Sequence, residues 1–163
     1  MADRNRQPPQ AGNRLRTASK GPSAAERALL RAAARARESA VAPYSKFKVG
    51  AALMARSGKI VTGANVESAS YGLTCCAERV ALFSALTAGH KHFTAIAVVA
   101  RAPGGATPCG ACRQLLAEYA PGATVWVADS TRLRSARRFT VAELLPEAFR
   151  EIPRRSRRQE PLS

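Results

Sequence analysis

The sequence predicts a single-domain α/β fold in which helices cover both faces of a mixed β-sheet, a three-layer α/β/α sandwich. Segments with the residue patterns of strands and helices alternate along most of the chain. Two of the strand segments, residues 93–100 and 124–128, are continuous apolar runs, the pattern of strands buried on both faces. A chain of 163 residues, of which 46% are hydrophobic, is long enough to enclose one such core.

Two capping boxes help to set the boundaries of the predicted elements. A hydroxyl residue is followed three positions later by Glu in Ser23–Glu26 and in Thr140–Glu143, and each pair satisfies the first amide groups of a helix. A short segment containing Gly, residues 56–58, predicts a hairpin connection. The predicted elements are, in chain order, a helix over 23–41, strands over 46–55 and 59–66, a helix over 75–88, a strand over 93–100, a helix over 109–120, a strand over 124–128 and a terminal helix over 140–149.

The net charge of +15 raises the question of a nucleic-acid partner, and its distribution argues against one. Much of the excess lies in the two ends of the chain, where no aromatic residues interleave with the basic ones to stack on bases. We therefore expect a disordered basic tail over 1–22, a folded domain over 23–149 and a basic tail over 150–163. A polyanion contact by the tails stays open as the lesser alternative.

The chain has no apolar run of membrane-spanning length, and its first residues do not resemble a secretory signal. We therefore expect no membrane association. Four cysteines without such a signal favour a metal site in a reducing compartment over disulfides. The predicted location is the cytoplasm.

Three cysteines have the spacing of a metal site. Cys109 and Cys112 form a C-x-x-C pair, and Cys76 lies about thirty residues upstream. Three ligands leave one position of a tetrahedral zinc ion open for water, which separates a catalytic zinc from a structural one. Glu78 follows Cys76 by two residues and can place a carboxylate beside the metal. Cys75 offers a four-thiolate structural site instead, but adjacent residues rarely bind one ion together.

Both halves of this site fall at predicted helix starts. The first amide groups of a helix lack helical partners and favour negative charge, so they lower the pKa of a cysteine placed there. Soft thiolate ligands together with a hydrolytic carboxylate point to zinc rather than iron, one ion per chain.

The motifs, taken together, resemble the zinc-dependent cytidine deaminases of the short, homotetrameric kind. The resemblance covers residues 25–149 and leaves out both tails. It rests on five segments in order: YSKFKVGAA at 44–52, NVESASYG at 65–72, CAER at 76–79, PCGACRQ at 108–114 and LLPEAF at 144–149.

This resemblance implies the hydrolysis of cytidine and deoxycytidine to uridine and deoxyuridine, with release of ammonia, in pyrimidine salvage. Glu78 would be the catalytic acid and base, moving a proton from water to the pyrimidine N3. Three thiolates leave excess negative charge on one zinc ion, and Arg79 would offset it by hydrogen bonding to a ligand sulfur. Arg79 otherwise has the simpler interpretation of a surface salt bridge.

The resemblance also implies a set of substrate-binding residues. Asn65 and Glu67 would bind the ribose hydroxyls, since an amide and a carboxylate together offer a donor and an acceptor. Phe47 would stack on the base, and Ala77 belongs to the same set. Tyr71 and Phe149 would complete the pocket of a neighbouring subunit, so their roles depend on a homotetramer.

Two alternatives remain open. The same chemistry could act on another aminopyrimidine, such as blasticidin S or a cytosine in RNA or DNA, although Asn65 and Glu67 favour a free nucleoside. A non-catalytic zinc module that binds nucleic acid through its tails is the second alternative. Glu78 and the open fourth ligand position argue against it.

Overall fold

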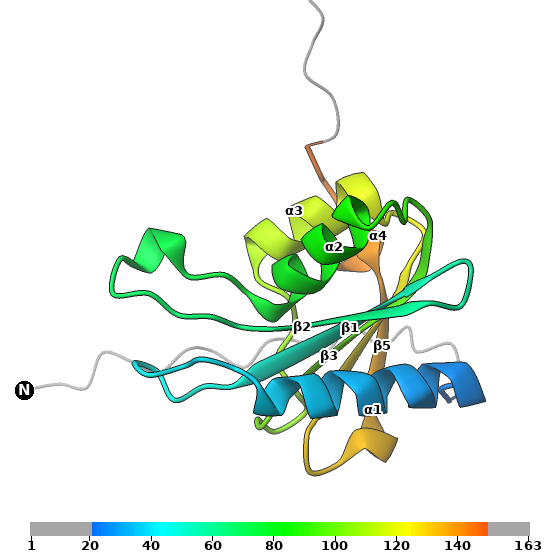
Figure 1. The fold of residues 1–163 in the computed structure, drawn as a ribbon. Coiled ribbons are helices and arrows are strands. Elements are labelled where there is room, and N and C mark those ends of the chain that lie inside the picture. The colour runs from blue at the N-terminus through cyan, green and yellow to red at the C-terminus, as the bar shows by residue number, and fades with distance from the viewer. Residues whose placement is uncertain (1–20, 150–163) are drawn as a thin grey trace, which may run out of the picture.

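The computed structural model describes residues 21–149, which form a five-stranded sheet with helices on both faces (Figure 1). The predicted tails, 1–22 and 150–163, lie outside these residues except for Gly21 and Pro22. In chain order the elements are α1 (Ala24–Glu38), β1 (Val49–Ala55), β2 (Ile60–Ala64), the 3₁₀ turn η1 (Tyr71–Leu73), α2 (Ala77–Thr87), β3 (Phe93–Ala100), α3 (Gly110–Tyr119), β4 (Thr124–Asp129), the 3₁₀ turn η2 (Leu133–Ser135), β5 (Arg137–Thr140) and α4 (Val141–Leu144).

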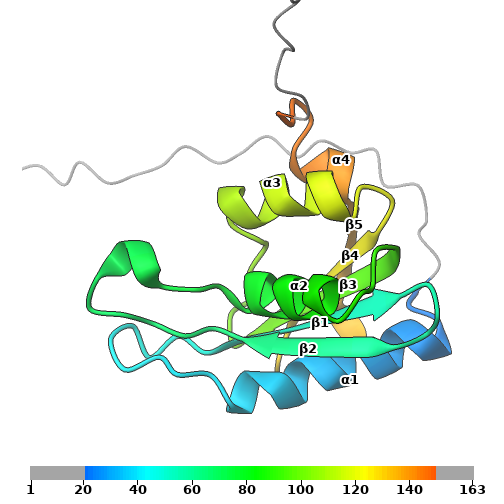
Figure 2. The ribbon, with the colours of Figure 1, turned by 45° about the horizontal axis from the view of Figure 1, so that its top comes forward.

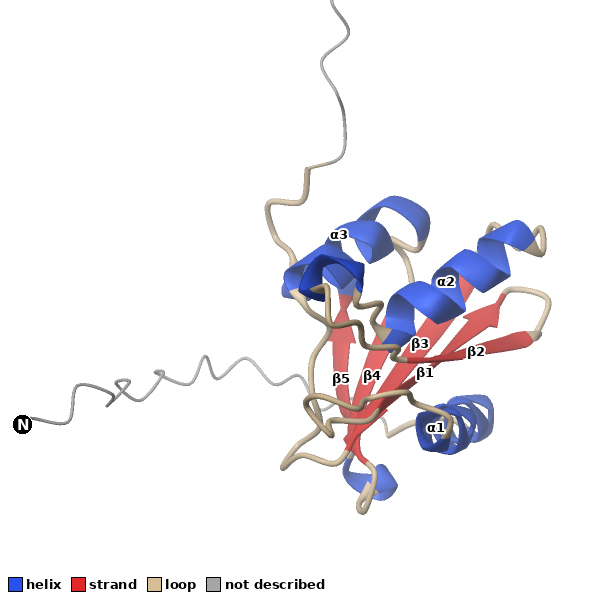
Figure 3. Ribbon diagram, turned by 60° about the vertical axis from the view of Figure 1, so that its left-hand side comes forward, coloured by secondary structure: helices blue, strands red, loops and turns tan. Residues whose placement is uncertain are grey.

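The sheet has the strand order β2-β1-β3-β4-β5 (Figure 3). The central pair β3 and β4 is parallel, and the other pairs are antiparallel. A parallel pair needs a crossover connection, and α3 provides it. The predicted mixed sheet and three-layer α/β/α architecture are therefore confirmed.

Helix α1 covers one face of the sheet by itself, below the strands in Figure 1. The predicted capping box of Ser23 and Glu26 starts this helix. Leu29 and Leu30 of α1 are fully buried against the sheet. A Cβ atom at Gly50 would lie 2.1 Å from the Ala33 carbonyl oxygen, so only glycine lets α1 approach β1 this closely.

Helices α2 and α3 lie side by side on the opposite face (Figures 1 and 2). The small residues Ala77, Ala81 and Ala85 of α2 are fully buried against the sheet. At Gly63 of β2, a Cβ atom would lie 2.4 Å from the Ala81 amide nitrogen. This close contact fixes where α2 begins, and its first residues belong to the functional site.

The prediction missed one strand and overextended the terminal helix. Residues 137–140 form β5, an exposed edge strand whose Phe139 pairs with Val125 of β4. Two arginines in a segment of four residues hide the strand pattern. The terminal helix ends at Leu144 rather than 149, because the residue before Pro146 is driven out of the helical region.

The predicted strand over 46–55 also begins too early. Lys46 has a φ of 59° in a tight turn, so the regular strand starts at Val49. The predicted hairpin between β1 and β2 is confirmed, with Gly58 at a φ of 85°. Among residues 21–149, no helix combines the length and apolarity needed to cross a membrane.

Candidate metal centre

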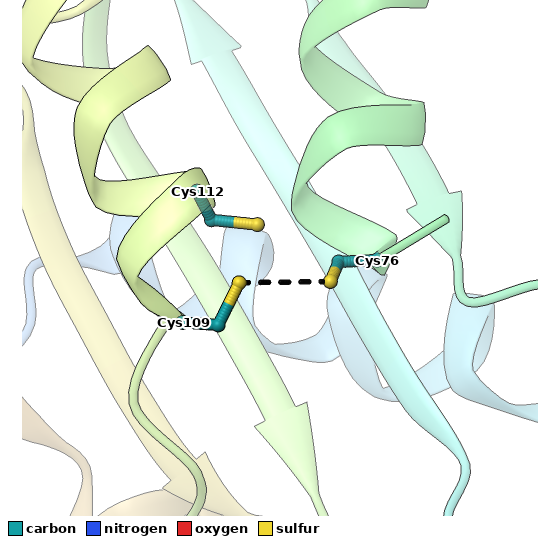
Figure 4. A group of neighbouring side chains, drawn as sticks. All are labelled: Cys76, Cys109 and Cys112. Atoms are coloured by element: carbon teal, nitrogen blue, oxygen red, sulfur yellow. Dashed lines mark hydrogen bonds between the residues drawn. The ribbon is translucent and has the colours of Figure 1, made fainter. Parts of the chain in front are cut away.

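The starts of α2 and α3 bring three cysteines together (Figure 4). Cys76 is the N-cap of α2 and Cys109 the N-cap of α3, while Cys112 lies one turn further along α3. Their three sulfur atoms lie within 4.8 Å of one another. Figure 4 shows the three side chains pointing toward a common centre. Cys75 is the remaining cysteine of the chain and lies outside this cluster.

The geometry of the cluster fits a zinc ion. Tetrahedral Zn²⁺ with Zn–S bonds of about 2.3 Å requires sulfur atoms about 3.8 Å apart. The Cys76 and Cys109 sulfurs are 3.8 Å apart. Three soft sulfur donors suit zinc and leave the fourth tetrahedral position for water.

The electrostatics of the cluster also call for a cation. A hydrogen bond from Cys112, followed by one from Cys109 and one from Arg79, lowers the pKa of Cys76. The same bond to Cys76, together with burial, raises the pKa of Cys112. Cys76 is therefore favoured as a thiolate, while Cys112 is favoured as a protonated thiol. Only a positive ion among them lets all three carry negative charge.

Glu78 lies in the first turn of α2 and is buried, with 6% of its surface exposed. Burial raises the pKa of its carboxyl group, and the negative charge of Cys76 raises it further. A carboxyl group in this environment holds a proton more readily than one in water. It is therefore suited both to take up and to release a proton.

A cavity of about 210 Å³ connects Glu78 with two of the cysteines. Its walls come from the loop before β1, the end of β2, the starts of α2 and α3, and the loop before α3. The lining residues are Ser45, Phe47, Val49, Asn65, Glu67, Thr74, Cys76, Ala77, Glu78, Val98, Ala106, Thr107 and Cys109. All five residues expected to bind substrate or catalyse within one chain line this cavity: Phe47, Asn65, Glu67, Ala77 and Glu78.

Asn65 is locked in place at the cavity wall. Its Oδ1 accepts a hydrogen bond of 2.7 Å from the Val49 amide, and its Nδ2 donates one of 3.0 Å to the Phe47 carbonyl. One N–H and one lone pair of the amide remain for a ligand. The side chain thus faces the cavity with its orientation already set.

Glu67 is held by the turn that precedes β1. Its carboxylate accepts hydrogen bonds from the amides of Tyr44 and Ser45 and from the Ser45 hydroxyl. The hydroxyl bond is the main reason that the pKa of Glu67 is lowered. The sequence prediction missed Ser45, and its place beside Phe47 in a matched motif is the signal that could have identified it.

Tyr71 and Phe149 do not reach the cavity of their own chain. Tyr71 lies in η1 with 83% of its surface exposed, and Phe149 is 63% exposed beyond α4. The η1 loop extends away from the sheet in Figure 1. Neither residue lines the cavity that holds Glu78.

Two arginines support the centre. Arg79 donates a hydrogen bond to the Thr74 carbonyl, and its positive charge helps to lower the pKa of Cys76. Arg113 donates to the carbonyls of Pro108 and Leu144, at 2.7 and 3.1 Å. It thereby ties the segment before Cys109 to α4, a contact that the sequence prediction missed.

Residues 23–128 match the family model described as the cytidine and deoxycytidylate deaminase zinc-binding region. The cytidine deaminase of Halalkalibacterium halodurans is 50% identical over 121 residues, which cover 74% of this chain and 91% of that protein. The solved structure of cytidine deaminase from Burkholderia pseudomallei is 52% identical with a TM-score of 0.71, and the match covers 75% of this chain and 97% of that one.

A blasticidin-S deaminase of Bacillus cereus is also similar, at 33% identity over 110 residues, or 63% of this chain and 76% of that protein. The zinc-type cysteine cluster, the neighbouring buried carboxyl group and the matches over most of the chain lead to one assignment. This protein belongs to the cytidine deaminase family of zinc-dependent enzymes.

Proposed function

We propose that the protein catalyses the hydrolytic deamination of cytidine and deoxycytidine to uridine and deoxyuridine, with release of ammonia. The observation that carries this proposal is the buried Glu78 carboxyl group, which shares one small cavity with the cysteine cluster and with Asn65. Relatives at 50% identity that are named cytidine deaminases support the choice of substrate.

Glu78 carries the proton transfers. Bound zinc supplies Lewis-acid activation of water for attack on the pyrimidine C4. Glu78 accepts a proton from that water and delivers it to N3. Glu78 then takes the proton of the new C4 hydroxyl group and gives it to the amino group, so that the C4–N bond breaks, ammonia leaves and the C4 carbonyl forms. Burial keeps the pKa of the carboxyl group above its ordinary value, as a group that both takes and returns a proton requires.

The remaining cavity residues position the nucleoside. Asn65 and Glu67 are suited to bind sugar hydroxyls, because each has hydrogen-bonding capacity left after its contacts within the protein. Phe47, with 40% of its surface exposed at the cavity, is suited to stack on the base. Ala77 lines the cavity wall beside Cys76. Arg79, whose positive charge helps to lower the pKa of Cys76, offsets the charge of three thiolates.

The enzyme acts as a homotetramer in this proposal, with Tyr71 and Phe149 completing the pocket of a neighbouring subunit. Their high exposure, and the fact that neither lines the cavity that holds Glu78, support such a role. We further propose that the folded domain comprises residues 23–149 and works in the cytoplasm in pyrimidine salvage, since free thiols in a metal cluster require reducing conditions.

The decisive experiment follows ultraviolet absorbance of cytidine with the purified wild type and Glu78→Gln, with zinc measured in both. We expect turnover by the wild type and a loss of about 10²–10⁴-fold in kcat in the variant, the usual contribution of a general acid and base. Zinc content should stay near one ion per chain. Glu38→Gln, an exposed carboxylate at the end of α1, is the matched control.

Equal activity in the wild type and Glu78→Gln would rule out the proposed proton transfer. Turnover of blasticidin S with none of cytidine would keep the chemistry and change the substrate. Bound zinc without turnover of either compound would leave a structural zinc module as the better interpretation.

A further inference from the structure

The tight turn before β1 folds around the carboxylate of Glu67. The amides of Tyr44 and Ser45 donate to Oε2 at 2.9 and 3.1 Å, and the Ser45 hydroxyl donates to Oε1. The Lys46 amide closes the turn by donating to the Ala42 carbonyl at 3.2 Å. The carboxylate is therefore the centre of this turn rather than a free side chain at the cavity wall.

Ser45 links this carboxylate to the start of the neighbouring cavity wall. The amide of Phe47 donates to the Ser45 Oγ at 2.9 Å. Because the hydroxyl oxygen accepts this bond, its own proton is directed to Glu67. One hydroxyl thus connects the Glu67 carboxylate with the backbone of Phe47, and all three residues line the same cavity.

The hydrogen bonds leave Glu67 with one acceptor site. A carboxylate offers about four lone-pair sites, two on each oxygen. The two amides occupy those of Oε2, and the Ser45 hydroxyl occupies one on Oε1. The remaining site on Oε1 is available to a single donor from a ligand. The direction in which this free lone pair points depends on Ser45, because the Ser45 hydroxyl is the group that holds Oε1 in place.

Ser45 contributes little to stability. Its side chain is exposed, and a hydrogen bond in contact with water is worth about 1 kcal/mol or less. The two backbone amides hold Oε2 without it. A variant without the hydroxyl therefore keeps its fold, and the loss falls on the orientation of Glu67.

We propose that Ser45 is a positioning residue, whose hydroxyl orients the Glu67 carboxylate so that its one free acceptor site meets a sugar hydroxyl of the substrate. The inference rests on the proposed deamination of nucleosides. It adds that recognition of the sugar depends on a residue that makes no contact with the sugar itself. It also couples sugar recognition to the position of Phe47, through the amide bond to the same oxygen.

The test compares wild type, Ser45→Ala and Ser45→Thr on three compounds: cytidine, deoxycytidine and 2′,3′-dideoxycytidine. Dideoxycytidine lacks the 2′- and 3′-hydroxyls, the two ring substituents from which Glu67 could accept a hydrogen bond. Binding of dideoxycytidine is measured by competition against cytidine, so it need not be turned over. Ser57→Ala, an exposed serine of the β1–β2 turn outside the cavity, is the matched control.

We expect Ser45→Ala to raise KM for cytidine and deoxycytidine by about 10-fold with kcat nearly unchanged, the pattern of lost substrate binding. The inhibition constant of dideoxycytidine should change by less than about two-fold, since this compound lacks the 2′- and 3′-hydroxyls that Glu67 would recognise. Ser45→Thr retains the hydroxyl and should restore most of the wild-type KM.

An equal loss of affinity for dideoxycytidine in Ser45→Ala would overturn the proposal, because the effect would not pass through the sugar hydroxyls. A Ser45→Thr variant as impaired as Ser45→Ala would also overturn it. Failure of the wild type to deaminate cytidine would instead contradict the proposed function, and this outcome is visible before any variant is made.

Discussion

Asn65 and Glu78 are the two polar or charged side chains that are buried among the described residues, and both line the same cavity. Burying such groups is costly unless something compensates for it. Asn65 is compensated by two hydrogen bonds to the backbone. Burial instead raises the pKa of Glu78, which favours the uncharged form and so reduces the cost of burying the group. A carboxyl group with a raised pKa is also suited to carry protons in a reaction.

A second carboxylate, Glu26, shows the opposite effect on the other face of the sheet. Burial raises its pKa, but hydrogen bonds from Ser23 and from the Trp126 indole outweigh that and lower the pKa below its ordinary value of 4.5. The indole bond is 2.9 Å long and joins α1 to β4. Because the folded-state pKa is the lower one, this group stabilises the fold fully above pH 4.5 and loses its effect as pH falls through the folded-state value.

We predict that Trp126→Phe lowers the free energy of unfolding at pH 7 by about 1 kcal/mol beyond the small change in packing. This effect is smaller than is usual for a hydrogen bond to a charged group, because water contacts the Glu26 carboxylate and screens the interaction. Urea unfolding at pH 7, 5, 4 and 3 measures it. The difference between the two proteins should shrink toward pH 3, and a difference independent of pH would show that the indole bond to Glu26 is not the cause.

At the scale of elements, two helix starts form the metal centre, and each is placed by a contact of its own. Gly63 lets α2 approach β2, and Arg113 ties the segment before α3 to α4. The third hydrogen bond of Arg113 goes to the Thr107 hydroxyl, at 3.2 Å. Thr107 also lines the cavity, so Arg113 supports both the ligand segment and the substrate wall.

We predict that Arg113→Gln weakens zinc binding by about 10-fold while the protein stays folded, in line with the effect of residues that hold metal ligands in place. Competition with a chromogenic chelator measures the affinity. Arg56→Gln, an exposed arginine in the hairpin between β1 and β2, is the control and should bind zinc as the wild type does. Unchanged affinity in Arg113→Gln would mean that the cysteine cluster forms without this support.

At the scale of the whole molecule, large apolar side chains are exposed in η1 and beyond α4. Tyr71, Leu73 and Phe149 are 83%, 75% and 63% exposed. Highly exposed aromatic and leucine side chains are typical of surfaces that become buried in protein interfaces. The proposed homotetramer would cover them.

We predict that the wild type sediments as a tetramer and that Leu73→Ser shifts it toward smaller species. Kcat/KM should fall by roughly 10-fold or more with the zinc content unchanged, because each pocket would lose residues from its neighbour. Sedimentation velocity and the cytidine assay on the same samples measure both effects. A monomeric wild type with full activity would contradict the assignment of Tyr71 and Phe149 to a neighbouring pocket.

Features that depend on short-range chemistry could be predicted from the amino-acid sequence alone. A capping box requires a hydroxyl residue and a Glu three positions apart, and both predicted boxes start helices. The C-x-x-C pair and the apolar run of β3 are equally local, and each was recognised without a structure. The family resemblance added the cytidine deaminase assignment, because its motifs are specific in combination.

Features that depend on contacts between distant parts of the chain could be identified only in the folded structure. The strand β5 exists because β4 offers it a partner, since its own residues are too basic and too few to predict a strand. The contact of Ser45 with Glu67 spans 22 residues, and that of Arg113 with Leu144 spans 31. Such hydrogen bonds form only where the fold brings two distant segments together, and a local pattern of residues does not predict which segments meet.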